Sequence, residues 1–129
     1  MSTISAFKYS CSTALHHLVT SVNEGVVSNG NRKNPIPAGT SVVVVSRTRD
    51  TNTSADGTVH VAIGIATGEI DSRDSGEVWD TWKDGQVVHN VKFFGKILVL
   101  PEEMHELAGR QAVTLWDAKT LFDWAIKQV

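Results

Sequence analysis

The sequence predicts an α+β fold, a small curled mixed sheet or partly open β-barrel of about five strands flanked by two or three helices. Three observations lead to this prediction. The 129 residues fit a single domain, 1–129. Short β-branched segments, interrupted by glycine, recur through the middle of the chain, and segments with helical spacing of apolar residues lie near both ends. Hydrophobic residues make up 41% and charged residues 20%, a balance that favours a packed core over disorder.

The first part of the chain predicts a strand, a helix and a loop. Residues 4–10 alternate apolar and small or polar side chains, as in a half-buried strand. A helix is expected to follow, capped by Ser12 or Thr13 and ended by Gly25. Residues 28–39 are rich in turn formers and include two prolines, so they predict a loop.

The middle of the chain predicts a hairpin. Residues 42–45 are an unbroken valine run, which favours a strand covered on both faces. Residues 47–57 are polar and end in Asp-Gly, so they are expected to form a long hairpin tip before a second strand at 58–65. Gly64 and Gly68 predict that this second strand bends sharply.

Two further stretches are less regular in pattern. Residues 69–86 are polar and are expected to form a connecting segment, although they contain two tryptophans. Residues 86–94 and 95–100 are apolar runs around Gly95, and the sequence leaves open whether they form one bent strand or two.

The last part of the chain predicts mainly helix. Pro101 and the two glutamates after it favour a short helix that Gly109 stops. Residues 112–115 are expected to add a short strand, and Asp117 to cap a final helix.

Charge and cysteine content narrow the functional classes. A net charge of −2 does not support tight nonspecific binding to long nucleic acid, so any nucleic-acid contact is expected to be local. The single cysteine, Cys11, excludes an internal disulfide and fits a reducing, cytoplasmic compartment. The sequence shows no leader-like pattern and no apolar run long enough to span a bilayer, so we expect an unprocessed protein without a membrane partner.

The order of elements and five strings resemble the PUA-like superfamily of small barrels, most of all its EVE and YTH group. The resemblance covers nearly the whole chain, and the strings are residues 7–12, 37–45, 61–70, 89–94 and 97–104. It implies a pocket for a base, nucleoside or nucleotide. EVE-type domains commonly carry a tryptophan in the first strand, where this chain has Phe7 and Tyr9, so one wall of the pocket is in doubt. The Gly-x-Lys-x-x-Glu-x-Arg signature of the ASCH branch is absent, which favours binding over catalysis.

Two tryptophans lie in the polar connecting segment. Trp79 and Trp82 are expected to stack on a base, a contact that contributes roughly 1 to 3 kcal/mol. The alternative is that one or both cover an open end of the barrel. Trp116 and Trp124 fall in or beside the final helix and are expected to be packing residues.

Small polar side chains follow the predicted strands. Ser10, Ser12 and Ser46 lie at strand ends, where hydroxyls can meet the polar edge of a ligand. Capping and turn formation explain them nearly as well, whereas the family resemblance implies that Ser10 or Ser12 lines the pocket. Asn90 can read a base edge with both donor and acceptor, or form an ordinary strand-edge pair.

Arginines flank the predicted hairpin. Arg47 and Arg73, together with Arg49, are candidates for a small phosphate clamp because guanidinium groups offer paired donors. The alternative is a solvated charged rim, since nearby aspartates follow the same segments: Asp50, Asp71 and Asp74.

The sequence offers little evidence for metal or covalent chemistry. None of the five histidines shows a metal-ligand spacing, and the glycine-rich phosphate-binding motifs of the Walker and Rossmann kinds are missing. A Cys11 nucleophile with His60 or His89 as its base has no local support. We therefore expect no cofactor, no metal and no catalytic residues.

These observations predict a non-enzymatic domain that recognises a nucleobase, nucleotide or flipped base, modified or unmodified, in an aromatic pocket. The alternative is a small protein-interaction or inhibitor module of the kind that phages and mobile elements encode, anchored by Trp79, Trp82 and the polar loop around residue 50. A nucleoside or amide hydrolase has the weakest support, because the sequence shows no acid/base pair.

Overall fold

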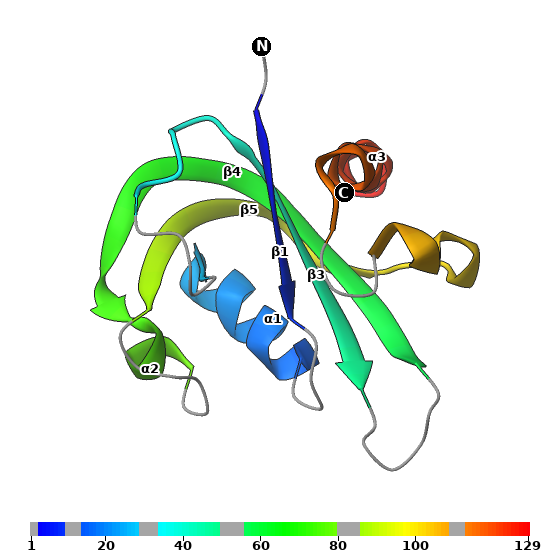
Figure 1. The fold of residues 1–129 in the computed structure, drawn as a ribbon, viewed down its shortest axis with the longest axis horizontal. Helices are drawn as coiled ribbons and strands as arrows, with labels where there is room; N and C mark the ends of the chain where they lie inside the picture. Colours follow the sequence, from blue (N-terminus) through cyan, green and yellow to red (C-terminus); the bar gives the residue numbers. More distant parts are fainter. Residues whose placement is uncertain (1–2, 10–13, 29–33, 50–55, 80–85, 109–112) are drawn as a thin grey trace.

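The computed structural model describes residues 3–9, 14–28, 34–49, 56–79, 86–108 and 113–129 (Figure 1). Five strands form one mixed sheet in the order β1-β3-β4-β5-β2, and helices cover both of its faces. No helix within the described ranges combines the length and apolar character that a membrane span requires. The elements are β1 (Ile4–Tyr9), α1 (Ala14–Glu24), β2 (Val26–Val27), β3 (Ser41–Arg49), β4 (Asp56–Asp74), α2 (Ser75–Val78), β5 (Val87–Val99), the 3-10 helix η1 (Glu102–Ala108) and α3 (Leu115–Ile126).

The sheet is a three-stranded meander with one strand added at each edge. β3, β4 and β5 pair antiparallel in chain order, β1 pairs parallel with β3, and β2 pairs antiparallel with β5. β1 and β2 are the two edges and do not pair with each other, so the sheet is not closed into a barrel. The α+β class and the five-stranded mixed sheet are therefore confirmed.

The two longest strands bend around α1, as Figure 1 shows. The β4–β5 register shifts between Ala66 and Ile70, and Gly68 in this interval has φ +87°, a conformation that glycine adopts without strain. At Gly64 the neighbouring strand lies so close that a Cβ atom would clash with the Lys92 carbonyl oxygen. The bend predicted from these two glycines is confirmed.

The sheet separates two hydrophobic layers. The inner layer, on the concave face, packs against α1; the outer layer packs against α3 and η1. Side chains alternate between the faces along each strand, so Val42 and Val44 point inward while Val43 and Val45 point outward. All four valines are fully buried, which confirms the strand covered on both faces.

Several predicted elements lie at their expected positions, whereas β3 and β4 reach into the predicted hairpin tip at 47–57. α1 ends at Glu24, and the Gly25 that follows has a φ of +68°, the left-handed conformation typical of a residue that terminates a helix. Residues 87–99 form one strand, which settles the alternative left open by Gly95. Pro101 precedes a short helix, which here has 3-10 geometry.

Three predictions for residues 69–117 are wrong. Residues 69–74 extend β4 instead of connecting elements, because the bend keeps them paired with β5. Residues 113–114 belong to no strand, and Leu115 opens α3. The cap of α3 is Thr114, not Asp117, since the Thr114 hydroxyl accepts the amide hydrogen of Asp117 at 3.1 Å.

Candidate functional site

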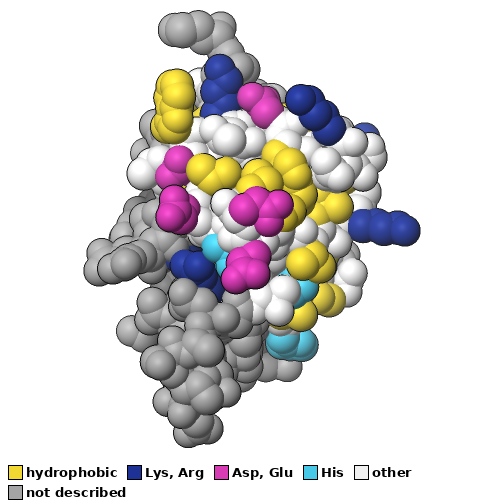
Figure 2. Space-filling view, turned by 90° about the vertical axis from the view of Figure 1, so that its right-hand side faces the viewer, with side chains coloured by type: hydrophobic (Ala, Val, Ile, Leu, Met, Phe, Trp, Pro, Cys, Tyr) yellow, Lys and Arg dark blue, Asp and Glu magenta, His cyan; other side chains and the backbone are white. Residues whose placement is uncertain are grey.

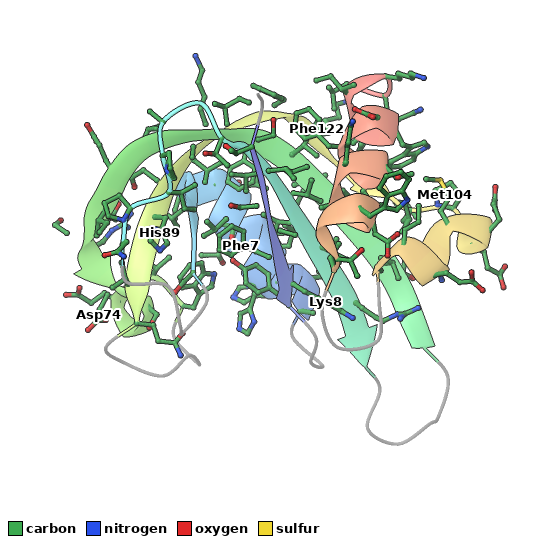
Figure 3. The ribbon with its side chains drawn as sticks, turned by 45° about the horizontal axis from the view of Figure 1, so that its top comes forward. Phe7, Lys8, Asp74, His89, Met104 and Phe122 are labelled. Carbon is green, nitrogen blue, oxygen red and sulfur yellow. The ribbon has the colours of Figure 1, made fainter. Side chains whose placement is uncertain are left out.

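Three side chains form a row across the inner face of the sheet. Tyr9 on β1 is in register with Ser46 on β3, and Ser46 is in register with His60 on β4. Strand alternation places all three on the side of α1. Figure 3 shows this alternation on β1, where Phe7 points toward α1 and Lys8 points to the other side. We call Tyr9, Ser46 and His60 the inner row.

The Tyr9 hydroxyl is buried and hydrogen-bonded. It lies 2.9 Å from the Ser21 hydroxyl of α1, and the Tyr9 residue is 4% exposed. Burial raises the pKa of Tyr9 to about 12, against smaller opposing effects of hydrogen bonds from Ser21 and from the Ser28 backbone. The phenol is therefore neutral at physiological pH.

The other two members of the row have unused hydrogen-bonding atoms. The Ser46 Oγ and the His60 Nδ1 are both buried, and neither has a hydrogen-bond partner among the described residues. An unsatisfied buried polar group costs about 1 to 3 kcal/mol, so such groups call for a partner, which a bound ligand or an ordered water can supply. Burial also lowers the pKa of His60, which favours the neutral imidazole at this position.

Trp79 is a core residue. Its side chain is 2% exposed, packs with Val26 and Val88, and donates its indole hydrogen to the His17 carbonyl oxygen at 3.1 Å. The ring centroid lies 6.3 Å from that of Tyr9, in an edge-on arrangement. A buried ring has no face free to stack on a base or to anchor a partner, so both roles predicted for Trp79 are wrong. Trp79 instead packs in a small core cluster with Val26 and Val88.

Three of the predicted site residues fall in two segments between the described elements. Ser10, Ser12 and Trp82 lie outside the described residues, in 10–13 and 80–85. Their roles as binding residues therefore stay predictions from the sequence.

Arg47 lies on the opposite face from Ser46. It has the orientation of Val43 and Val45, toward the outer layer, and is only 8% exposed. It is in register with Val59 near the start of β4, whereas Arg73 lies 14 positions later in the same strand. The two arginines cannot act on one phosphate, so the predicted clamp is wrong.

Arg73 is held by carboxylates at the other end of β4. Its Nε lies 3.0 Å from Asp71 and its NH1 lies 3.1 Å from Glu24. These contacts raise the pKa of Arg73 and lower that of Asp71. Figure 3 shows Asp74, the next residue, at the left edge of the molecule, whereas Lys8 lies near its middle. A hollow of about 190 Å³ lies here, lined by Ile70, Asp71, Ser72, Arg73, Asp74, Gln86 and Val87.

Asn90 is also remote from the inner row. It pairs with Val26 of β2, while the β5 residue opposite His60 is Val99, nine positions further along the strand. Its backbone oxygen accepts a hydrogen bond from the Thr67 hydroxyl at 3.4 Å. Asn90 therefore matches the strand-edge alternative. The adjacent His89 is fully buried and lies on the inner side of the bend in Figure 3.

The two tryptophans of α3 differ. Trp124 packs against the outer layer as predicted, but Trp116 is 80% exposed, so its assignment as a packing residue is wrong. Helical spacing explains the difference, because Trp116 shares the solvent face with Lys119 and Asp123. Figure 2 views this side of the molecule and shows acidic side chains among hydrophobic ones.

Two residues of the row were not predicted as binding residues. Tyr9 entered the sequence analysis only as a departure from the family pattern, and His60 only as a base for Cys11. The available signal was a polar residue at the inward-facing position of a buried hairpin, where Ser46 and His60 oppose each other. No group of three metal-ligating side chains occurs within the described ranges.

In comparisons with known proteins, no family model, curated protein or solved structure matches this chain.

Proposed function

We propose that the protein is a non-enzymatic binding module for a nucleobase, free or as part of a nucleotide or flipped nucleotide, with the inner row, whose Tyr9 and Ser46 are buried in the free protein, as the recognition site. The observation that carries the proposal is the pair of buried, unpartnered atoms at facing positions, Ser46 Oγ and His60 Nδ1. The resemblance to PUA-like domains of the EVE and YTH group is a prediction that agrees with this reading.

The chemistry of the row suits a base edge. A serine hydroxyl can donate and accept, and a neutral imidazole nitrogen does one or the other according to its tautomer. The edges of nucleobases present donors and acceptors side by side, which is the complement of this pair. Tyr9 adds an aromatic neighbour, and Trp82 stays the stacking ring predicted from the sequence.

The proposal concerns base recognition and assigns no phosphate contact to the predicted arginines. Arg47 faces the outer layer, and both described ion pairs of Arg73 engage carboxylates far along β4. A phosphate, where the ligand carries one, is expected to contribute less affinity than the base.

The first experiment is a thermal-shift screen against bases, nucleosides, mononucleotides and short single strands that contain modified bases. A ligand that binds only the folded protein raises its Tm, and isothermal titration calorimetry then gives Kd. We expect Ser46→Ala and His60→Phe each to weaken binding about tenfold, since each removes one hydrogen bond to the ligand. Thr120→Ala, on the exposed face of α3, is the matched control and is expected to bind normally.

Two results contradict the proposal. The first is no Tm increase with any member of the screen. The second is a ligand whose Kd is unchanged in both Ser46→Ala and His60→Phe, since it would then bind somewhere other than the inner row.

We also propose a second candidate function, a protein-interaction module, because one observation favours it. Trp116 is 80% exposed, and tryptophan is the side chain most often found at the energetic centre of protein interfaces. Native mass spectrometry of the purified protein separates the candidates. A bound base supports the first, whereas a protein retained by wild type and lost from Trp116→Ala supports the second.

A further inference from the structure

The edge strand β2 is much shorter than its neighbour β5. β5 has 13 residues, but β2, its neighbour on the outer edge, has 2. β2 pairs with His89 and Asn90, and the Val91 amide donates to the Gly25 carbonyl oxygen at 2.8 Å. From Lys92 to Val99, no strand among the described residues pairs with this edge. We call Lys92–Val99 the open edge.

An open edge exposes hydrogen-bonding groups of the backbone. In an antiparallel sheet, every second residue of an edge strand points its N–H and C=O away from the neighbouring strand. An extended peptide that adds a strand satisfies these groups, and its side chains then decide specificity. The backbone of the open edge is therefore suited to pairing with one more strand.

The geometry also says where such a strand would pair. The β4–β5 register shifts between Phe94 and Leu98, and Gly95 within this irregularity has φ +58°. Regular pairing is thus available next to β2, over Lys92–Phe94. An added strand would continue the line that β2 begins.

The side chains indicate which partner fits. Phe93 and Ile97 pack against the inner layer, and Phe94 and Leu98 against the outer layer, so they belong to this protein's own core. The exposed side chains of the open edge are Lys92, Lys96 and Val99, the last 61% exposed. The segment contains no carboxylate.

These charges favour a foreign strand over a second copy of this chain. Two open edges paired with each other would place four lysines along one ribbon, and like charges on paired strands are destabilising. We propose that the open edge of β5 binds an extended acidic segment of a partner protein, with backbone pairing at Lys92–Phe94 and charge pairing to Lys92 and Lys96.

The test uses two short peptides with blocked ends, one of alternating Glu and Val and the other of alternating Lys and Val. We expect the acidic peptide to bind and the basic peptide to bind at least about tenfold more weakly at low salt. In hydrogen exchange, the acidic peptide should slow the Phe93 amide, which lies two positions from the Val91 amide that faces β2 and so points to the open side of β5. Lys96→Glu should weaken its binding about tenfold, while Lys119→Glu on α3 makes the same charge change away from the edge and should not.

Four results would overturn the inference. Neither peptide binds; both bind equally, which would remove the role of the lysines; or the slowed amides lie outside β5. Sedimentation of the free protein as a dimer that Lys96→Glu alters would also overturn it, because a second copy would then occupy the edge. None of these measurements depends on the base-binding proposal, which is tested at the inner row.

Discussion

The two faces of the sheet are built from different chemistry. The outer layer is an aliphatic and aromatic cluster under α3 and η1, centred on fully buried residues such as Val61 and Leu121. Figure 3 shows Met104 of η1 and Phe122 of α3 on this side. The inner layer also contains valines and a leucine, but it adds buried hydroxyl and imidazole groups, including Ser46 and His60.

Because of this difference, we expect the outer layer to contribute mainly to stability and the inner row mainly to ligand binding. The outer layer gains free energy from its buried methylene groups, although it also holds the buried Arg47. The inner layer retains atoms whose hydrogen-bonding capacity is unused, which lowers stability unless a ligand supplies the partner. The comparison therefore predicts that substitutions in the outer layer change the free energy of unfolding, whereas substitutions in the inner row change ligand affinity.

The largest expected effect is on the outer layer. Leu121→Ala removes a fully buried side chain under α3 and should lower the free energy of unfolding by about 2 to 5 kcal/mol. Urea denaturation measures this loss. Ligand Kd, measured at a temperature where the variant is folded, should not change; a large change in Kd would mean that the two layers are coupled.

A comparably large effect is expected at alkaline pH. Tyr9 is the single tyrosine, and burial raises its pKa from 10 in the unfolded chain to about 12 in the fold. The stabilisation linked to the neutral Tyr9 phenol is fully present below pH 10. It is lost as pH rises through 12, because Tyr9 ionises at lower pH in the unfolded chain than in the folded one. The loss should be about 3 kcal/mol. Phenolate absorbance reports the folded pKa directly; a value near 10 would show that the hydroxyl is hydrated, and Tyr9→Phe should lack this pH dependence.

A smaller effect distinguishes two buried serines of the inner layer. Ser21→Ala removes a partner of the Tyr9 hydroxyl and should cost about 1 kcal/mol. Ser46→Ala removes an unpartnered hydroxyl and should leave stability unchanged or raise it by up to about 1 kcal/mol. Chemical denaturation of both variants makes the comparison. Equal losses would indicate that Ser46 has a hydrogen-bond partner in solution.

The smallest effect is expected at the far end of β4. Arg73→Ala breaks half-exposed ion pairs with Glu24 and Asp71, so it should change the free energy of unfolding by less than about 1 kcal/mol, and less still at high salt. Base affinity should stay the same, because Arg73 is remote from the inner row. A tenfold loss of affinity in Arg73→Ala would restore the phosphate role predicted from the sequence.

Local sequence patterns predicted the helices, strands and bends better than they predicted which strands pair with each other. The valine run at 42–45, the glycine at 25 and the bend near Gly68 follow from short-range sterics, and all three are confirmed. β2 was missed because two residues carry no periodicity, and their pairing with β5 is a tertiary effect. The cap at Thr114 was missed because Asp117 offers an equally good local signal.

The candidate site was less predictable for the same reason. Residue type alone grouped Arg47 with Arg73, but one faces the outer layer and the other lies far along a bent strand. Trp79 and Trp116 show that the exposure of an aromatic ring depends on the elements packed around it and not on its polar neighbours in sequence. Ser46 was predicted at the end of a strand but lies inside β3, and its pairing with His60 required the register of the hairpin.

The parallel pairing of β1 with β3 has a consequence for the order of folding. Arg49 pairs with Asp56, seven positions away, whereas Ile4 pairs with Ser41, 37 positions away. Contacts between distant positions form later, because closing the longer loop costs more chain entropy. The β3–β4–β5 meander is therefore expected to nucleate folding. β1, the first strand to be synthesised, is expected to dock last, so the inner row is completed only at the final step.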